Sequence, residues 1–205
     1  MPVLTALEVA DDPARWRDAG FAVADDGTCT IGGVAVRLRP IEGKKGIRSW
    51  AFDDIGSVEV EGIPTSTSAA PSAGGQHPNG TTSIDHVVVL SPDVDRTVEA
   101  FRAVGLDPRR ERQTDSYGAP MRQVFFRSGE VIVELVGGRE PVGDGPCRFF
   151  GIAVTVGDID ATKALLGDEL GDPKDAVQPG RRIATLRKTA GLTTAVAFMS
   201  PEPRP

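Results

Sequence analysis

The sequence predicts an α+β fold, because a pattern of one strand, one helix and further strands begins three times along the 205-residue chain. The three predicted helices end at Gly20, Gly105 and Gly167, and glycine is favoured just past a helix C-terminus. Each helix also begins beside an aspartate that can accept hydrogen bonds from free backbone amides. A repeat of about 50 residues is typical of stacked or paired units, and pairing would let two sheets close around a shared cavity.

The first unit occupies residues 1–63. Asp12 followed by Pro13 predicts a helix start, because proline suits the first helical position. Asp26-Gly27 and Gly32-Gly33 are typical of tight turns between strands. The expected elements are a strand at 4–10, a helix at 13–19, a strand at 21–25, a hairpin at 28–40 and a last strand at 46–55.

Residues 64–82 differ in composition from the units around them. Proline, serine, glycine and alanine dominate the part from 64 to 80, and almost nothing there is suited to burial. Such a composition indicates a linker or a long surface connection.

The domain after the linker, residues 83–200, contains two further units, at 83–140 and 147–200, and residues 201–205 form a tail. Val94, Val98 and Phe101 share one face of the first predicted helix at i, i+4 and i+7. The remaining expected elements are strands at 84–90, 121–128, 130–136, 148–156 and 191–201, a strand within each of 106–120 and 175–188, and a helix at 159–166.

The overall composition narrows the class of protein. A formal net charge of −6 argues against a nucleic-acid partner, which usually meets a basic surface. There is no apolar run of about 18 residues, so no membrane span is expected. The first residues lack a basic segment followed by an apolar one, and two cysteines do not make a disulfide framework. We therefore expect a cytoplasmic protein.

Three stretches resemble the glyoxalase/bleomycin-resistance/extradiol-dioxygenase superfamily, also called vicinal oxygen chelate (VOC) proteins: IDHVVVLSPDVDRTVEAF, EVIVELVGG and FFGIAVTVGDIDATKALL. The resemblance covers residues 83–200 and, more weakly, 3–62. It implies two paired βαβββ modules that form a glyoxalase-like half-open barrel, with an additional degenerate βαβββ-like module at the N-terminus. Metal-using members hold a divalent ion in the cup of this barrel, with a His near the start of each module and a Glu near its end.

Carried over to this chain, the resemblance places His86 and Glu134 at the first module's ligand positions. The second module has Gly151 and Ala197 at the equivalent positions, and neither side chain can bind a metal. The resemblance therefore supplies half of a metal site, and a catalytic zinc site usually needs three protein ligands. A third ligand would have to come from His77, from Asp115 or from a partner subunit.

The residues themselves allow two interpretations of this pair. His86 lies among apolar neighbours on a strand, and it is either a half-buried structural histidine or a ligand or base that titrates near neutral pH. Glu134 lies within an apolar run, where a carboxylate costs several kcal/mol unless it is paired or hydrogen-bonded. It is therefore either functional or tied to a partner such as Arg122, Arg181 or His86.

The turn at residues 178–182 is either a solvated basic turn or an anion clamp at the mouth of the cup, since arginine binds carboxylates through two parallel hydrogen bonds. The residues that we expect to contact a substrate are Tyr117, Arg122, Gln123, Phe125, Phe150, Gln178, Arg181 and Arg182.

Two functions from different classes follow from the resemblance. The first is a small-molecule enzyme that uses His86 and Glu134 as an acid–base pair for isomerase or lyase chemistry on a small polar carbonyl or vicinal-oxygen compound, with or without a divalent metal. The second is a metal-free binding or sequestration protein of the bleomycin-resistance type, and a structural module with a relic cup is a third reading. The N-terminal sheet needs a cover, either the barrel itself or its own copy in a homodimer.

Overall fold

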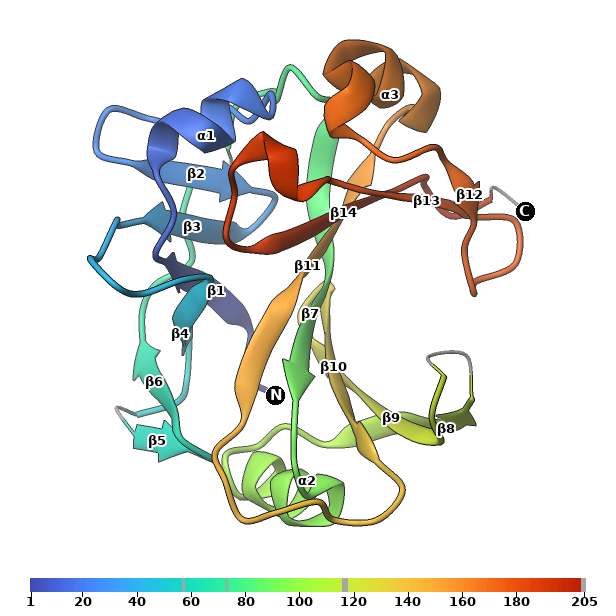
Figure 1. Ribbon diagram of the computed structural model, residues 1–205. Coiled ribbons are helices and arrows are strands. Elements are labelled where there is room, and N and C mark those ends of the chain that lie inside the picture. Colours follow the sequence, from blue (N-terminus) through green and yellow to red (C-terminus); the bar gives the residue numbers. More distant parts are fainter. Residues whose placement is uncertain (57, 73, 116–117, 204–205) are drawn as a thin grey trace.

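The chain folds into two mixed β-sheets (Figure 1). The computed structural model describes residues 1–56, 58–72, 74–115 and 118–203. The helices are α1 (Pro13–Asp18), α2 (Val94–Ala103) and α3 (Ile159–Leu166), with short 3-10 helices at Gly167–Glu169 and Lys188–Ala190. The strands are β1 (Leu4–Val9), β2 (Thr28–Ile31), β3 (Val34–Leu38), β4 (Ile47–Phe52), β5 (Val58–Val60), β6 (Ile63–Thr67), β7 (Thr81–Leu90), β8 (Pro108–Thr114), β9 (Met121–Ser128), β10 (Val131–Gly138), β11 (Arg148–Val156), β12 (Lys174–Asp175), β13 (Arg182–Thr185) and β14 (Ala195–Met199).

Local signals place the helices where the sequence predicts them. The side chains of Asp12, Asp93 and Asp158 each accept a backbone hydrogen bond at the start of α1, α2 and α3. Gly105, just past α2, has φ +86°, a left-handed conformation in which glycine carries no steric penalty. The helix boundaries therefore follow from short stretches of sequence.

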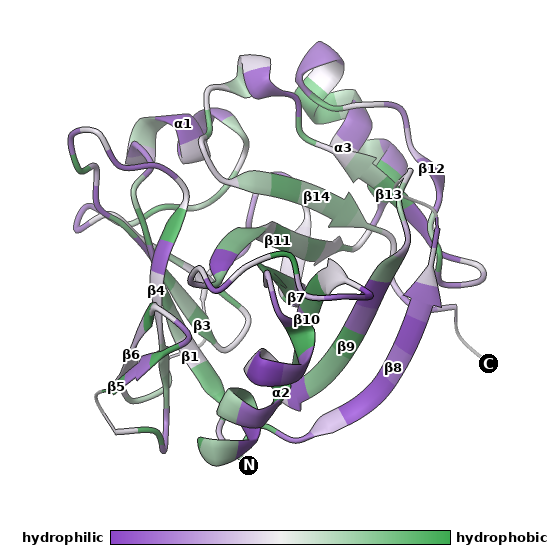
Figure 2. Ribbon diagram, turned by 60° about the horizontal axis from the view of Figure 1, so that its bottom comes forward, coloured by the Kyte–Doolittle hydropathy of each residue, from purple (hydrophilic) through white to green (hydrophobic). Residues whose placement is uncertain are grey.

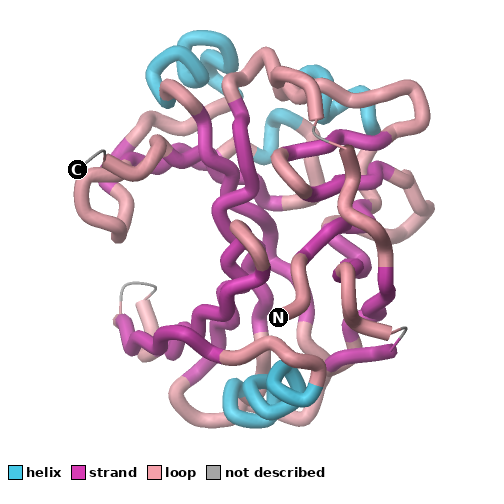
Figure 3. Tube along the Cα trace, turned by 180° about the vertical axis from the view of Figure 1, so that it is seen from behind, coloured by secondary structure: helices cyan, strands magenta, loops and turns pink. Residues whose placement is uncertain are grey.

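The larger sheet has eight strands in the order β12-β13-β14-β11-β7-β10-β9-β8. It consists of two βαβββ modules, β7-α2-β8-β9-β10 and β11-α3-β12-β13-β14, joined through the antiparallel pair β7 and β11. In each module the first strand pairs in parallel with the last. The sheet curves into an open half-barrel (Figure 3), so the predicted α+β fold with paired modules is confirmed.

The smaller, N-terminal sheet has the strand order of a pair of modules, whereas the sequence suggests only one module there. Its order is β2-β3-β1-β4-β6-β5, with β1 antiparallel to β4, β1 parallel to β3, and β4 parallel to β6. The six central strands of the larger sheet have the same order and directions, with β7 in place of β1 and β11 in place of β4. The N-terminal sheet thus has the topology of a reduced pair of modules, in which the second module lacks its helix.

The expected strand at residues 21–25 is wrong. The amide of Ala22 donates to Nδ1 of His77 rather than to a neighbouring strand, and Phe21 packs against Trp16 and Phe198. These contacts draw the segment into the core between the sheets. The module therefore lacks the edge strand that corresponds to β8 in the larger sheet.

The segment at residues 64–80, expected to bury almost nothing, belongs to the fold at both of its ends. β6 runs through Ile63–Thr67 and pairs with β4 and β5, so the N-terminal sheet extends past residue 63. His77 and Asn79 are buried, and Asn79 donates through its amide to the carbonyl of Ala19. The described residues between β6 and His77 are exposed or half-buried, as expected of a surface connection.

The two sheets share one hydrophobic core, which contains buried residues from both. Trp50 of β4 packs edge-on against Phe149 of β11, with ring centroids 5.2 Å apart, and against Phe101 of α2 at 5.7 Å. The barrel therefore covers one face of the N-terminal sheet. The homodimer stays a prediction.

His77 makes the stability of the N-terminal unit depend on pH. Burial lowers its pKa from the ordinary 6.5, although a hydrogen bond to the carbonyl of Thr30 opposes the shift. Between the lowered value and 6.5 the unfolded chain binds more protons, so the free energy of unfolding should fall as the pH drops through 6.5. We expect a His77→Gln variant to show a shallower pH dependence in urea unfolding between about pH 8 and pH 5.5. An unchanged slope would contradict this assignment.

None of the described helices is long and apolar enough to cross a membrane. Cys29 and Cys147 are both buried free thiols.

Candidate active site in the cup of the barrel

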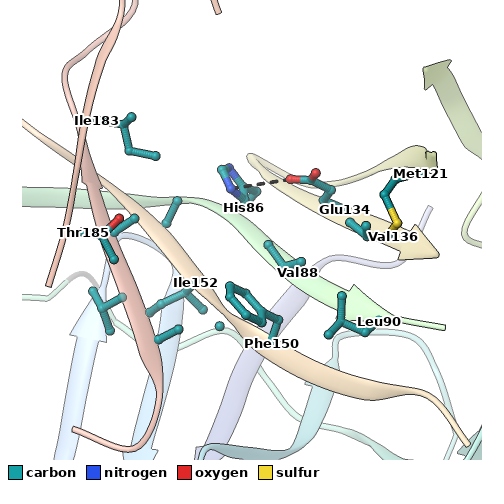
Figure 4. Close-up of a pocket in the computed structure, with 15 residues that line it drawn as sticks. His86, Val88, Leu90, Met121, Glu134, Val136, Phe150, Ile152, Ile183 and Thr185 are labelled. Atoms are coloured by element: carbon teal, nitrogen blue, oxygen red, sulfur yellow. Dashed lines mark ion pairs between the residues drawn. The ribbon is translucent and has the colours of Figure 1, made fainter. Parts of the chain in front are cut away.

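A cavity of about 450 Å³ lies on the concave face of the eight-stranded sheet. Figure 4 shows His86 and Glu134 side by side at this cavity, with apolar side chains around them. The lining residues are His86, Val88, Leu90, Met121, Glu134, Val136, Phe150, Gly151, Ile152, Ala153, Ile183, Thr185, Ala195, Val196 and Ala197. Apart from His86, Glu134 and Thr185, the described lining is apolar. Figure 2 shows the same character along the inner strands, where β11 and β14 carry mostly hydrophobic residues.

Strand register brings His86 and Glu134 together. β7 and β10 are parallel neighbours in which His86 lies opposite Ile132 and Glu134 opposite Val88. Side chains two residues apart on a strand share a face, so His86, Val88 and Glu134 all point into the cup. Nε2 of His86 lies 3.6 Å from Oε2 of Glu134, and the two side chains are only 15% and 12% exposed.

Glu134 is held from its other side by a chain of donors. The side-chain amide of Gln123, on β9, donates to Oε1 of Glu134. Arg112, on the edge strand β8, donates through Nε to Oε1 of Gln123 at 2.8 Å. Gln123 is thereby oriented with its NH₂ group towards the carboxylate, which leaves Oε2 of Glu134 to face His86 and the cavity.

Behind His86 lies a residue that the sequence did not point to. Oδ1 of Asp85 is 2.7 Å from Nδ1 of His86, and Oδ2 of Asp85 is 2.6 Å from Nη1 of Arg181. Burial alone raises the pKa of Asp85, but the hydrogen bonds from His86 and Arg181 and the positive charge of Arg181 outweigh burial and hold that pKa below the ordinary 3.8. Asp85 is therefore an ionised carboxylate at neutral pH.

Four of the expected substrate-contacting residues lie at or near the cavity. Phe150 lines it and is 58% exposed, while Gln123 contacts Glu134. Phe125, on β9, pairs with Glu134 across the strands but is not among the lining residues. Arg181 reaches the site as the buried partner of Asp85, and its Nε donates to the carbonyl of Ser200.

The other expected contacts lie elsewhere. Arg122 binds Glu111 of β8 and Asp95 of α2, because it alternates with Gln123 and so faces the helix side of the sheet. Arg182 binds Asp160 of α3.

Gln178 is exposed in the turn that precedes Arg181, outside the cavity lining. Of the two readings of this turn, the ion pairs of Arg181 with Asp85 and of Arg182 with Asp160 disfavour the anion clamp. Tyr117 lies outside the described residues.

The donor set does not fit the metal site that the family resemblance implies. Glu134 lies two residues beyond Ile132, the strand partner of His86. In the same way, Ala197 lies two residues beyond Ala195, the strand partner of Gly151, so Gly151 and Ala197 are the equivalent pair in the second module. These positions carry no donor atom. No group of three or more His, Cys, Asp or Glu side chains among the described residues is arranged to hold a metal ion.

Asp85 does not complete the set. Its carboxylate lies on the Nδ1 side of the imidazole ring, whereas Glu134 lies on the Nε2 side. One ion therefore cannot contact Nε2 of His86 and both carboxylates together.

Close packing against β14 requires a glycine at position 151, whatever the role of this position in metal binding. A Cβ atom at this position would collide with the carbonyl oxygen of Ala195 and lie 2.8 Å from its Cβ. We expect Gly151→Ala to lower the free energy of unfolding by roughly 1–3 kcal/mol, measured by urea titration. Gly157→Ala is the matched control, because nothing lies within 4 Å of a Cβ there. Equal stability of the two variants would show that the sheet yields at Gly151.

Comparison with known proteins agrees with this architecture. A variant of 4-hydroxymandelate synthase from Streptomyces coelicolor aligns with a TM-score of 0.66 and 14% sequence identity, covering 100% of this chain and 94% of that one. Methylmalonyl-CoA epimerase from Mycobacterium tuberculosis aligns with a TM-score of 0.49 and 18% identity, covering 60% of this chain and 91% of that one. No protein-family model and no curated protein matches the sequence.

The chain therefore has the VOC, or glyoxalase-like, fold that its sequence resembles. The alignment over the whole chain includes the N-terminal sheet as well as the barrel. At this level of identity the similarity establishes the fold, and the chemistry has to be argued from the cup itself.

Proposed function

We propose that the cup binds a small molecule and that His86 and Glu134 transfer a proton within it, as in an isomerase or a lyase. The observation that carries this proposal is the 3.6 Å approach of Nε2 of His86 to Oε2 of Glu134 at a cavity of about 450 Å³. An imidazole that accepts a proton this close to a carboxylate gains a stabilising negative charge beside it. General acid–base catalysis of this kind contributes about 10²- to 10⁴-fold to a rate.

The apolar lining of the cavity favours a less polar substrate than the small polar carbonyl or vicinal-oxygen compound expected from the sequence. A small polar compound would leave most of its groups unpaired against the aliphatic wall, and each such group costs free energy. We therefore propose a substrate with a mainly apolar body and one carbonyl group, whose adjacent C–H bond is made acidic. Thr185 is the third polar residue of the described lining and can donate a hydrogen bond to the carbonyl oxygen.

The proposed step uses the chain's own side chains. Nε2 of His86 removes the proton next to the carbonyl, and the carboxylate of Glu134 stabilises the imidazolium that forms. The apolar wall lowers the local dielectric constant, which strengthens this electrostatic stabilisation. Return of the proton to a different position or face gives an isomer, and loss of a leaving group instead gives a lyase product.

Solvent exchange tests the proposal even when the product of the reaction is unknown. A panel of aliphatic ketones and thioesters is incubated with the protein in D₂O, and loss of the C–H signal beside each carbonyl is followed by proton NMR. We expect exchange of at least one compound by the native protein and none by His86→Ala. Exchange that persists in His86→Ala would contradict the assigned base.

A metal-free binding protein is the second candidate, and the apolar lining together with Gly151 and Ala197 favours it. The same experiment separates the two functions. A compound that shows line broadening or saturation transfer with the native protein, but keeps its protons indefinitely, would support sequestration over catalysis.

A further inference from the structure

We propose that Asp85 and Arg181 form a positioning pair that holds His86 in the tautomer with its proton on Nδ1, so that Nε2 faces Glu134 as a free proton acceptor. The use of that acceptor in catalysis rests on the proposed function. The pair and the tautomer are properties of the protein alone and can be tested without a substrate.

The pair depends on a β-bulge in β7. Successive side chains on a regular strand point to opposite faces, so Asp85 and His86 would normally be separated by the sheet. Here Ala153 of β11 lies opposite His86 and Val154 lies opposite Ile84, which leaves Asp85 as an extra residue without a partner. A bulge of this kind redirects a side chain. It places the Asp85 carboxylate within 2.7 Å of the neighbouring imidazole.

Arg181 fixes Asp85 from the far side. Nη1 of Arg181 contacts Oδ2 of Asp85 at 2.6 Å, and the two side chains are 5% and 12% exposed. Arg181 is itself anchored by the Ser200 carbonyl at 2.9 Å and by the hydroxyl of Thr155 at 3.4 Å. This arginine is therefore committed to the carboxylate and is not available to bind an anionic ligand.

The tautomer follows from the donors and acceptors. An ionised carboxylate can only accept, so the hydrogen bond between Asp85 and Nδ1 of His86 requires the proton to be on Nδ1. The ion pair with Nη1 of Arg181 at 2.6 Å keeps this carboxylate ionised. A neutral imidazole has one N–H, so Nε2 then carries a lone pair directed at Glu134 and the cavity.

Stability does not account for this pair. A buried ion pair contributes little net stability, because the loss of hydration offsets the attraction between the charges, and well-packed apolar residues often serve as well. A pair that touches a histidine at the cavity therefore indicates a role in orienting that histidine.

Histidine-selective ¹⁵N labelling tests the proposal directly, because the chain has only two histidines. His77 is an internal control of the opposite tautomer: its Nδ1 accepts from the amide of Ala22, which leaves the proton on Nε2 facing the carbonyl of Thr30. At about pH 8, where an ordinary imidazole is neutral, long-range ¹H–¹⁵N correlation should show a protonated Nδ1 for His86 and a protonated Nε2 for His77. A protonated Nε2 on His86, alone or together with Nδ1, would overturn the proposal.

Substitution of the pair provides the second measurement. In Asp85→Asn the amide oxygen can still accept a hydrogen bond from Arg181, and the NH₂ group faces Nδ1 of His86. Because an NH₂ group can only donate, Nδ1 must accept, and the proton of His86 should move to Nε2. Asp160→Asn is the matched control, because Asp160 pairs with the neighbouring Arg182 outside the cavity and should leave His86 unchanged.

The apolar double variant Asp85→Leu with Arg181→Met removes both charges and should fold with a similar melting temperature. We expect it to lose the uniform Nδ1–H signal of His86. If Asp85→Asn does not fold, the native spectrum and this double variant decide the proposal. A double variant that keeps the Nδ1–H tautomer would overturn it, whereas loss of exchange activity in His86→Ala bears on the proposed function instead.

Discussion

Replacing Glu134 by glutamine is expected to lower the rate of proton exchange about 10²- to 10⁴-fold while the melting temperature stays nearly unchanged. Glutamine has the shape of glutamate, so the contact with Gln123 and the packing on β10 can be kept. The substitution removes the negative charge that stabilises an imidazolium 3.6 Å away. The rate is measured by deuterium incorporation into whichever carbonyl compound the native protein exchanges.

Glu111→Gln is the matched control for this experiment. Glu111 pairs with Arg122 on the helix side of the sheet, so its neutralisation changes the net charge equally but leaves the cup untouched. A Glu134→Gln variant with full exchange activity and a much lower melting temperature would show that Glu134 has a structural role.

Truncation of Trp50 to alanine is expected to lower the free energy of unfolding by about 3–5 kcal/mol, the range for large buried aromatic residues. Its side chain is 2% exposed and packs against Phe149 and Phe101 across the junction between the two sheets. The cavity left behind would loosen the back of β11, which also lines the cup. Urea unfolding followed by circular dichroism gives the change in free energy.

Phe150→Ala is the comparison for Trp50→Ala. Phe150 neighbours Phe149 on the same strand, but it is 58% exposed and lines the cavity, so its loss should weaken ligand binding with little effect on stability. Comparable stabilities of the two variants would contradict the assignment of Trp50 as the joint between the sheets.

The sequence predicted those parts of the fold that depend on neighbouring residues. Capping aspartates at the helix starts and glycines at the helix ends act within one turn of chain, and all three helices lie where these signals place them. The strand at 21–25 was predicted incorrectly and the buried ends of residues 64–80 were missed, because both depend on distant contacts. His77 takes the amide that a strand partner would have bound, and β6 exists only because β4 and β5 lie beside it.

The candidate site also contains residues that the sequence indicated and residues that depend on the tertiary structure. His86 and Glu134 were identified by residue type and position in the modules, and the register of β7 and β10 brings them together. Asp85 was missed because its direction depends on a bulge opposite β11, a strand more than 60 residues further along the chain. Arg122 was predicted to line the cup, but side chains alternate along β9, and Arg122 lies on the face that contacts α2.

The class of fold and the repeated module could be predicted from the amino-acid sequence, because capping and periodicity act locally, and the resemblance to the VOC proteins implied the histidine and glutamate at the cup. Three features became visible only in the folded chain: the N-terminal sheet repeats a pair of modules, the cup is apolar, and Asp85 and Arg181 stand behind His86. These features follow from which strands pair and in which register, and a shift of one residue in register sends every side chain of a strand to the opposite face.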